Sequence, residues 1–509
     1  MSTEEIIGSP QQVAIWDALR DGSGHILGRA RAGTGKTVAI IEGVKRMPFR
    51  KFRIAFVAFN KSIAKELQEK IPSSAKAFTL HSMALQGIKR WNPDVVIDTK
   101  RKKVQSAFDE AWSELPSSFV FSRLSEYRVR TAAVKCASLC KNEGYGIYGE
   151  FLDDERSSAF IGSILDHYDI DVPLEFEREL MVEVVQLMLE YAADYVDLID
   201  FDDMAWFPGV HEGITLPKYD LLVVDESQDL NLTQHYLVEQ SAGERVLLAG
   251  DDRQQIYSWR GVSLDSIGLL TESLGEVDEF PLTVSRRCPQ SVVELAKRLV
   301  PDFEAMPDAP EGHVGNCSER DVVRYAAPGD MILCRTNGPN LSMFYQLLAA
   351  GKSAFVLGRG STSTQLIQAI KQLQADDMTE FHEKLARYEK RQVRSLEQQE
   401  APRSRFALLE DKITCLRSIA EHCHSTSHML SYVENMFSAK DRAESITLSS
   451  IHKAKGLEAK NVWILKPQQM PHSMATKDWE IEQELNCCYV AVTRSAGKLM
   501  FAGKTPRCL

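Results

Sequence analysis

The sequence predicts an α/β protein with two lobes, each built on a parallel sheet and each interrupted by a helical insertion. Residues 26–37 (ILGRARAGTGKT) form a short apolar run that passes through a glycine turn into a helical pattern. Residues 219–229 (YDLLVVDESQD) form a second apolar run, which ends in acids. Beyond Asp251, short apolar runs alternate again with helical segments, which indicates a second parallel sheet.

The length and composition are those of a multidomain globular protein. At about 100 to 200 residues per domain, the 509 residues leave room for roughly three to five domains. A content of 44% hydrophobic and 26% charged residues excludes a disordered or collagenous chain. The formal net charge of −11 argues against a protein that coats nucleic acid with a basic surface, but it is compatible with a local basic groove.

The sequence carries no signal for a membrane or an oxidising compartment. No apolar run is long enough to span a bilayer, and MSTEEIIGSPQQ lacks the features of a signal peptide. We therefore expect a cytoplasmic protein, or a nuclear one in a eukaryote. The ten cysteines include no C-x-x-C, which predicts free thiols. Zinc binding by His422, Cys423, His424 and His428 is conceivable, but the lack of a second cysteine pair nearby favours a solvated helix end.

The first lobe must contain an insertion. Lys36 and Asp225 are too far apart in the sequence for one compact sheet, and residues 85–195 between them are rich in helix formers. Within this region, residues 180–198 repeat apolar side chains at helical spacing. We expect a first lobe of residues 1–84 and 196–280 with a helical subdomain at 85–195.

The second lobe is expected at residues 281–363 and 441–509. Residues 364–440 are polar and include a charged run typical of a solvated helical face, so they predict a second, shorter helical insertion. The further predicted strands are 246–249, 331–334, 354–357, 446–448 and 461–465.

Residues 30–37 (ARAGTGKT) are the expected phosphate-binding loop. Gly33 and Gly35 allow backbone amides to curl around phosphates, Lys36 adds a cation, and the Thr37 hydroxyl can ligate Mg²⁺. Ala30 stands where the pattern has its first glycine. The residues expected to bind the nucleotide here are Ala30, Arg31, Ala32, Gly33, Thr34, Gly35, Lys36 and Thr37.

Asp225 and Glu226 end an apolar run, where a nucleotide-binding sheet carries its magnesium carboxylate. We expect Asp225 to hold Mg²⁺ together with Thr37, and Glu226 to orient and deprotonate the attacking water. Acids also favour a helix start, so a helix-capping cluster is the alternative. The phosphate loop upstream favours the catalytic interpretation.

The ordered motifs resemble those of the superfamily 1 helicases of the UvrD/Rep type. The resemblance rests on the phosphate loop, VVDESQD, LAGDDRQQIYSWRG (248–261), ITLSSIHKAKGLE (446–458) and YVAVTR (489–494). It covers nearly the whole chain outside the insertions. HKAKGLE and ELNCCYVAVTR are most similar to the F-box DNA helicase branch, although no F-box is evident. The resemblance implies two RecA-like lobes of the P-loop NTPase class, with ATP and Mg²⁺ as cofactors.

Further nucleotide contacts are implied by the resemblance alone. Gln11, or Gln12 in its place, is similar to the glutamine that reads the adenine edge, and Gln254 resembles the sensor of the γ-phosphate. The second lobe would add two arginine fingers, an adenine-stacking residue and a sugar contact. These are Arg287 and Arg494, Arg286 in place of the usual tyrosine, and Glu458.

A single-stranded DNA track is also expected. Tyr257 and Trp259 alternate, so they would share one face of an extended segment, with Arg260 beside them. Taken alone, the two rings favour a core aromatic pair, whereas the resemblance implies that this segment stacks on DNA bases. The resemblance adds Phe59, Asn60, His81, Thr447 and His452. Asp202 and Asp203 match a family signature, with helix capping as an equally weighted interpretation.

By resemblance, the chain is a monomeric ATP-dependent DNA helicase that moves 3′ to 5′ on single-stranded DNA. We expect a role in DNA repair, recombination or replication, with DNA junctions as partners and no membrane. The chain stops soon after Arg494, which leaves no room for an appended nuclease. Two alternatives stay open: a translocase that strips proteins without unwinding duplex, and a nucleotide-gated DNA-binding regulator of recombination.

Overall fold

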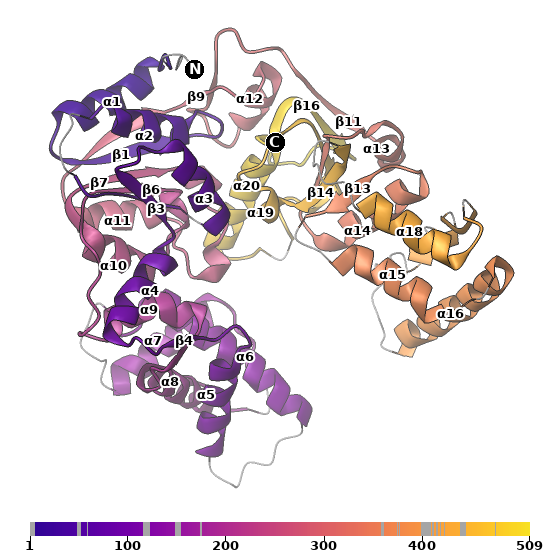
Figure 1. Cartoon of the computed structure of the whole chain (residues 1–509), viewed down its shortest axis with the longest axis horizontal. Helices are drawn as coiled ribbons and strands as arrows, with labels where there is room; N and C mark the ends of the chain where they lie inside the picture. The colour runs from indigo at the N-terminus through magenta and orange to yellow at the C-terminus, as the bar shows by residue number, and fades with distance from the viewer. Residues whose placement is uncertain are drawn as a thin grey trace. The chain divides into compact units, whose positions relative to one another are not determined.

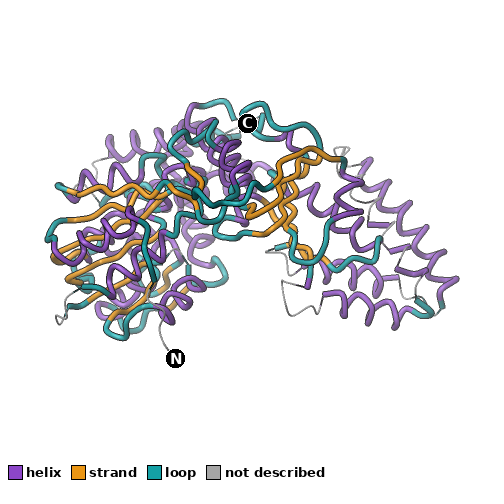
Figure 2. Tube along the Cα trace, turned by 90° about the horizontal axis from the view of Figure 1, so that it is seen from above, coloured by secondary structure: helices purple, strands orange, loops and turns teal. Residues whose placement is uncertain are grey.

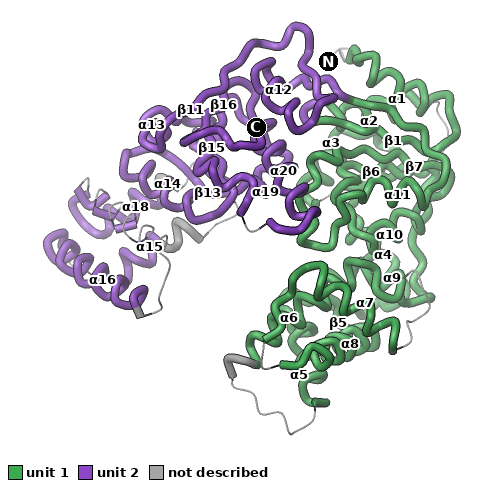
Figure 3. Tube along the Cα trace, turned by 180° about the vertical axis from the view of Figure 1, so that it is seen from behind, with its two compact units in different colours: residues 1–31, 35–282 green, residues 32–34, 283–509 purple. Residues whose placement is uncertain are grey.

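Two compact units make up the protein: residues 1–31 with 35–282, and residues 32–34 with 283–509 (Figure 3). Each contains a six-stranded parallel sheet, which confirms the predicted α/β class. None of the described helices is long and apolar enough to cross a membrane. The computed structural model describes residues 6–47, 52–58, 60–115, 123–147, 154–173, 176–357, 361–373, 375, 377–398, 409, 412–413, 416–417, 419–421, 423–437, 444–473 and 475–509.

The sheet of the first unit brings three functional strand ends to one edge. Its strand order is β3-β2-β6-β7-β1-β8. Strands β1, β3, β6 and β7 are labelled in Figure 1. Because β7 pairs in parallel with both β1 and β6, the carboxyl ends of these three strands lie side by side. The strands are β1 (His25–Ala30), β2 (Ile54–Val57), β3 (Ala75–Phe78), β6 (Tyr219–Asp225), β7 (Ala242–Gly250) and β8 (Val277–Leu282).

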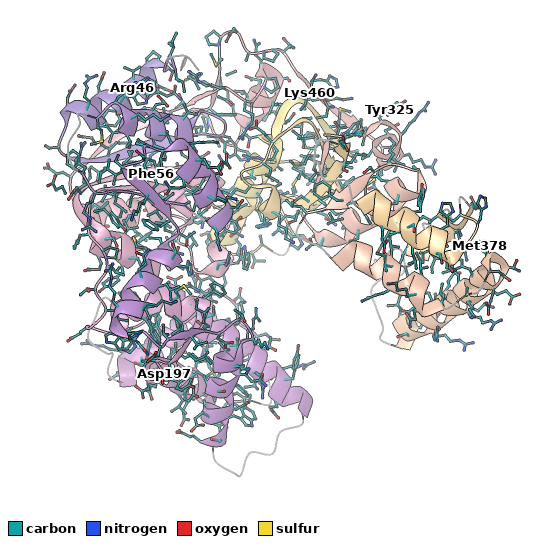
Figure 4. The ribbon with its side chains drawn as sticks, in the orientation of Figure 1. Arg46, Phe56, Asp197, Tyr325, Met378 and Lys460 are labelled. Atoms are coloured by element: carbon teal, nitrogen blue, oxygen red, sulfur yellow. The ribbon has the colours of Figure 1, made fainter. Side chains whose placement is uncertain are left out.

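Helices cover both faces of this sheet, as Figure 2 shows. Phe56 and Val223 belong to one core, and the alternate residues Ala55 and Val224 belong to the opposite core. Figure 4 shows Phe56 among the strands. The first core includes residues of α1 (Pro10–Asp21), α2 (Lys36–Lys45) and α3 (Lys61–Lys70), and the second includes residues of α4 (Leu80–Trp91), α9 (Phe201–Val210), α10 (Leu232–Ser241) and α11 (Ser266–Leu274).

A helical insertion lies between α4 and α9. It contains α5 (Lys102–Ser113), α6 (Arg123–Asn142), α7 (Asp154–His167) and α8 (Arg178–Asp194), and Asp197 follows them (Figure 4). The two-residue strands β4 (Val96–Ile97) and β5 (Leu198–Ile199) pair in parallel at its base.

Three buried charged side chains connect α5 and α6 to α9. The Asp203 carboxylate is fully buried and lies 2.8 Å from the Lys103 Nζ and 2.5 Å from the Lys141 Nζ. Burial lowers the pKa of Lys103. Burial also opposes the charge of Lys141, but Asp203 and Asp200 raise its pKa above the ordinary value. The cluster is stable because each ammonium group has a carboxylate partner.

The second unit has the strand order β11-β16-β15-β12-β14-β13. Four predicted strands correspond to β12, β13, β14 and β15; their predicted ranges were 331–334, 354–357, 446–448 and 461–465. The strand predicted at 246–249 lies within β7 of the first unit. The bounds are β11 (His313–Cys317), β12 (Met331–Cys334), β13 (Ala354–Val356), β14 (Ile446–Ser450), β15 (Ala459–Leu465) and β16 (Ser495–Ala502), with a separate short pair, β9 (Val284–Ser285) and β10 (Glu304–Ala305).

The helices of the second unit include an insertion between β13 and β14. Leu366, Phe381 and Val433 of this insertion share one apolar core with Ile332 and Trp463 of the sheet. The exact boundaries predicted between lobes and insertions stay predictions. The helices are α12 (Gln290–Ala296), α13 (Glu319–Tyr325), α14 (Asn337–Ala349), α19 (Ile451–Ala454) and α20 (Asp478–Val492), and, in the insertion, α15 (Ser361–Leu373), α16 (Met378–Gln398) and α18 (Thr426–Phe437).

Replacing Asp203 with Ala should lower the free energy of unfolding of the first unit by about 3 to 5 kcal/mol, because two buried ammonium groups lose their partner. Urea denaturation followed by circular dichroism measures this loss. The control is Asp109→Ala, which removes an exposed ion pair with Arg130 and should cost less than about 1 kcal/mol. Equal losses of unfolding free energy in the two variants would show that the buried cluster stabilises the protein no more than an exposed ion pair does.

Candidate active site

The phosphate loop joins the end of β1 to the start of α2. Gly33 and Gly35 have φ angles of 71° and 77°, in the left-handed region that glycine adopts without strain. Gly35 is the N-cap of α2 and makes no side-chain cap, so the first amides of this helix are available to an anion. The Gln12 side chain donates to the Gly35 carbonyl (3.3 Å) and also forms a capping box with Ser9. Gln12 therefore supports the loop, and Gln11 stays the predicted adenine contact.

The predicted catalytic residues of the first unit meet at the sheet edge. The Lys36 Nζ lies 3.0 Å from Asp225 Oδ1 and 2.8 Å from Glu226 Oε1. The Thr37 hydroxyl donates to Asp225 Oδ2 (3.1 Å). Burial opposes the charge of Lys36, but the two carboxylates raise its pKa above the ordinary value, so the side chain is a permanent cation. Asp225 and Thr37 together form the hard oxygen donor set that suits Mg²⁺.

A hydrogen-bond network extends from Glu226 to the end of β7. The Gln228 side-chain amide group donates to Glu226 Oε2 (2.6 Å). Its Oε1 accepts a hydrogen bond from the backbone amide of Asp251 (3.0 Å). Gln254 in turn donates to Asp251 Oδ2 (2.5 Å). Burial raises the pKa of Asp251 to about 6, although Arg31 opposes this shift. The predicted sensor Gln254 is thus linked to the predicted base Glu226 through Asp251 and Gln228.

Arg31, predicted to contact the nucleotide, has acidic partners in this structure. Its buried guanidinium lies 2.8 Å from Asp252 and 3.4 Å from Asp251, because β1 and β7 are neighbours in the sheet. Arg31 therefore neutralises acids at the end of β7, and its contact with the nucleotide stays a prediction.

The nucleotide contacts predicted from the second half of the chain lie in the second unit. Arg287 pairs with Glu458 through its Nε, so the carboxylate predicted to bind the sugar holds one of the two predicted arginine fingers in this structure. Arg494 is 1% exposed, and its guanidinium donates to the carbonyls of Val490 (2.9 Å) and Leu457 (3.1 Å). The Arg286 side chain is exposed, as stacking on a base would require.

Tyr489 is a functional candidate that the sequence did not single out. Residues 32–34 group with the second unit, and there the Ala32 amide donates to the Tyr489 hydroxyl (3.0 Å). The Arg286 amide donates to the Gly33 carbonyl (2.8 Å). Tyr489 opens the YVAVTR motif, so its place in that motif was the signal that could have identified it.

The aromatic pair expected to bind DNA bases is arranged differently from the prediction. Residues Ser258–Arg260 form a 3₁₀ turn that ends at Gly261 in the left-handed region, so Tyr257 and Trp259 do not share one face of an extended strand. Trp259 is 50% exposed, which excludes the core interpretation for this residue. The Arg260 guanidinium lies 5.6 Å from its ring centroid. Trp259 and Arg260 therefore present one exposed face, and Tyr257 is half-buried.

Phe201 is another exposed aromatic side chain of the first unit, and the sequence did not single it out. Its ring is 60% exposed and lies edge-on to His81, with 6.4 Å between the centroids. Burial lowers the pKa of His81, so this ring is neutral near pH 7. Asn60 caps α3 by accepting from the Ile63 amide (2.9 Å), and Phe59 lies outside the described residues.

Other predicted side chains have structural partners. Burial lowers the pKa of His452 to about 4, and its Nε2 lies 3.7 Å from Cys487 Sγ, so this ring is neutral near pH 7, and its contact with DNA stays a prediction. Thr447 in β14 is 8% exposed, too buried in this structure for the predicted DNA contact. Asp203 forms a capping box with Asp200, which confirms the capping interpretation.

The described part of the histidine-rich segment contains two stacked histidines. His424 and His428 stack with 5.9 Å between ring centroids, and His422 lies outside the described residues. No group of three metal-ligating side chains occurs among the residues that the structure describes.

Two family models match the chain. One describes the UvrD/REP helicase N-terminal domain and matches residues 11–274, and the other describes the UvrD-like helicase C-terminal domain and matches residues 175–504.

Curated relatives are similar at low identity. F-box DNA helicase protein 1 of Schizosaccharomyces pombe is 23% identical over 93% of this chain and 55% of its own length. DNA helicase IV of Escherichia coli is 22% identical over 58% of this chain and 48% of its own length. The ATP-dependent DNA helicase PcrA of Staphylococcus epidermidis is 21% identical over 97% of this chain and 83% of its own length. The chain spans about half the length of the first of these relatives.

Asp251 should make stability depend on pH. Its folded pKa of about 6 exceeds the ordinary 3.8, so it stabilises the fold below pH 4, and this contribution is lost as the pH rises through 6. Between pH 5 and pH 8, the unfolding free energy of the wild type should fall by about 1 to 2 kcal/mol relative to Asp251→Asn. Urea denaturation at both pH values measures this.

Asp252→Asn is the matched control. Burial disfavours the charge of Asp252, but Arg31 lowers its pKa below the ordinary value, so Asp252 is ionised throughout this pH range. Its variant should keep most of the wild-type pH dependence, somewhat weakened because the Asp252 charge contributes to the raised pKa of Asp251. If the unfolding free energy of Asp251→Asn depends on pH as that of the wild type does, the raised pKa of Asp251 is wrong.

Proposed function

This chain belongs to the UvrD-like helicase family, and from that premise we propose that it is an ATP-dependent DNA helicase and translocase moving 3′ to 5′ on single-stranded DNA. The observation that carries the proposal is the cluster of Lys36, Asp225, Glu226 and Thr37 at the sheet edge, which would combine a cation, a metal donor set and a base. We propose a role in DNA repair, recombination or replication, acting as a monomer at DNA junctions in the cytoplasm, or in the nucleus of a eukaryote.

The nucleotide would bind at the start of α2. The amides of this turn and the Lys36 ammonium would hold the outer phosphates, so Lys36 would exchange its carboxylate partners for phosphate oxygens. Asp225 and the Thr37 hydroxyl would hold Mg²⁺, which supplies charge neutralisation at the phosphates when bound. Gln11 would read the adenine edge.

Glu226 would act as the general base. Lys36 pairs with its Oε1 and Gln228 with its Oε2, so both carboxylate oxygens are oriented before the reaction. Once Lys36 turns to the phosphates, Oε1 would accept a proton from the attacking water. Gln254, linked to Glu226 through Asp251 and Gln228, would report the state of the γ-phosphate.

The second unit would complete the site when ATP binds. Arg287 and Arg494 would contact the γ-phosphate, Arg286 would stack on the base, and Glu458 would reach the sugar after releasing Arg287. Hydrolysis removes the phosphate that the arginines bind, so the units would separate again. Repeated closure and opening would move the chain along a strand held at Trp259, Arg260 and Phe201.

Lys36→Ala and Glu226→Gln should separate binding from hydrolysis. Lys36→Ala loses the phosphate cation and should lose both ATP affinity and turnover, whereas Glu226→Gln should still bind ATP and lose turnover by about 10² to 10⁴-fold. Fluorescent-nucleotide titration and DNA-stimulated phosphate release measure the two properties. Glu279→Gln is the control. It removes the ion pair between Glu279 of β8 and Arg29 of β1, and it should retain both ATP affinity and turnover. Wild-type turnover in Glu226→Gln would exclude this residue as the base.

Trp259→Ala should weaken binding of a single-stranded oligonucleotide by about 1 to 3 kcal/mol, because an exposed stacking face is lost. Fluorescence anisotropy measures the affinity, and ATP turnover without DNA should persist. The matched control is Trp91→Ala, which removes another partly exposed tryptophan of the same unit that stacks on His211. Equal affinity losses in both variants would contradict a specific track at Trp259.

Unwinding and protein stripping need separate assays. Strand displacement on a duplex with a 3′ tail tests the helicase proposal, and streptavidin displacement from biotinylated single-stranded DNA tests translocation alone. ATP turnover that DNA does not stimulate would contradict both the helicase and the translocase, and it would favour a nucleotide-gated DNA-binding regulator of recombination.

A further inference from the structure

The last turn of α6 lies where three functional parts of the first unit meet. Its final residue, Asn142, contacts both the segment that follows Glu226 and the turn that carries Trp259. Ser138, one turn earlier, donates to Asp202 Oδ2 (2.5 Å), next to Phe201.

The contact with the catalytic strand runs through Asn231. The 3₁₀ turn Ser227–Asp229 follows Glu226 directly, and Asn231 then caps α10 by accepting from the Gln234 amide (2.9 Å). The Asn231 side-chain amide donates to Asn142 Oδ1 (2.6 Å). A second bond lies beside it, from the Thr233 hydroxyl to the Lys141 carbonyl. The end of α6 therefore fixes the chain that leaves the predicted base.

The contact with the Trp259 turn is steric. Gly261 ends this turn with a φ angle of 82°, and a Cβ at this position would lie 2.9 Å from the Asn142 Cβ. The turn therefore packs its backbone directly against Asn142. The Asn142 amide donates to the Ser138 carbonyl (2.8 Å), which fixes the orientation of the side chain.

We propose that Asn142 is a positioning residue that holds the Trp259 turn at a fixed place relative to Glu226, so that DNA binding at Trp259 accelerates ATP hydrolysis. The inference rests on the proposed function, and it adds α6 to the parts that link DNA to the ATP site. Loss of the Asn142 side chain would leave the buried Asn231 amide without this acceptor and would open space beside Gly261. Both neighbours could then shift independently.

The test compares ATP turnover with and without single-stranded DNA in four full-length proteins: wild type, Asn142→Ala, Asn231→Asp and Thr131→Ala. Asn231→Asp keeps the cap acceptor of α10 but loses the amide that donates to Asn142. Thr131→Ala removes an exposed hydroxyl bond within α6 and touches neither neighbour, so it is the matched control. Oligonucleotide affinity and the melting temperature are measured on the same preparations.

We expect DNA-stimulated turnover to fall roughly three- to thirtyfold in Asn142→Ala and in Asn231→Asp, while turnover without DNA and oligonucleotide affinity largely persist. Thr131→Ala should match the wild type. An unchanged ratio of stimulated to basal turnover in Asn142→Ala and Asn231→Asp overturns the inference, as does an equal loss of both activities. A wild type that DNA does not stimulate overturns the proposed function together with the inference.

Discussion

The contact of Lys36 with Asp225 and Glu226 constrains the whole first unit. Lys36 and two acids from a distant part of the sequence can lie together at a largely enclosed sheet edge only if the enclosed charges are paired, since an unpaired buried charge costs several kcal/mol. Parallel pairing of β1, β7 and β6 satisfies this condition, because it brings their carboxyl ends to one edge. The same edge places Arg31 beside Asp251 and Asp252. The strand order and the chemistry at this edge therefore depend on each other.

The two kinds of contact in the first unit have different roles. Apolar side chains on the two faces of the sheet supply most of the burial, and they tolerate exchange for others of similar volume. The polar contacts are at the junctions: Asp203 between α5, α6 and α9, Gln228 between β6 and β7, and Asn231 between α6 and α10. Because hydrogen bonds are directional, these junctions fix how the elements are oriented, which packing alone leaves less defined.

Much of this arrangement could be predicted from the sequence, because it depends on local patterns. Short apolar runs mark strands such as β6 and β12, and the glycines of the phosphate loop mark a turn that other residues adopt with strain. The partners of Arg31 could not be predicted, since they depend on which strands are neighbours. The turn at Trp259 also differed, because alternating aromatic residues indicate a shared face only if the backbone is extended, and Gly261 instead ends a 3₁₀ turn. Asn142 has no motif of its own, and its importance follows from contacts that only the fold creates.

The buried lysines of the insertion have a practical consequence for chemical labelling. Lys103 is 1% exposed and its ammonium group is enclosed beside Asp203, so this amine reacts with acylating reagents only when α5 and α9 separate. Acylation of Lys103, read by mass spectrometry as a function of time, would report how often the insertion opens. Lys102, which is exposed on α5, provides the internal reference for reagent concentration. The buried ion cluster thereby supplies a probe for local opening in the unmodified protein.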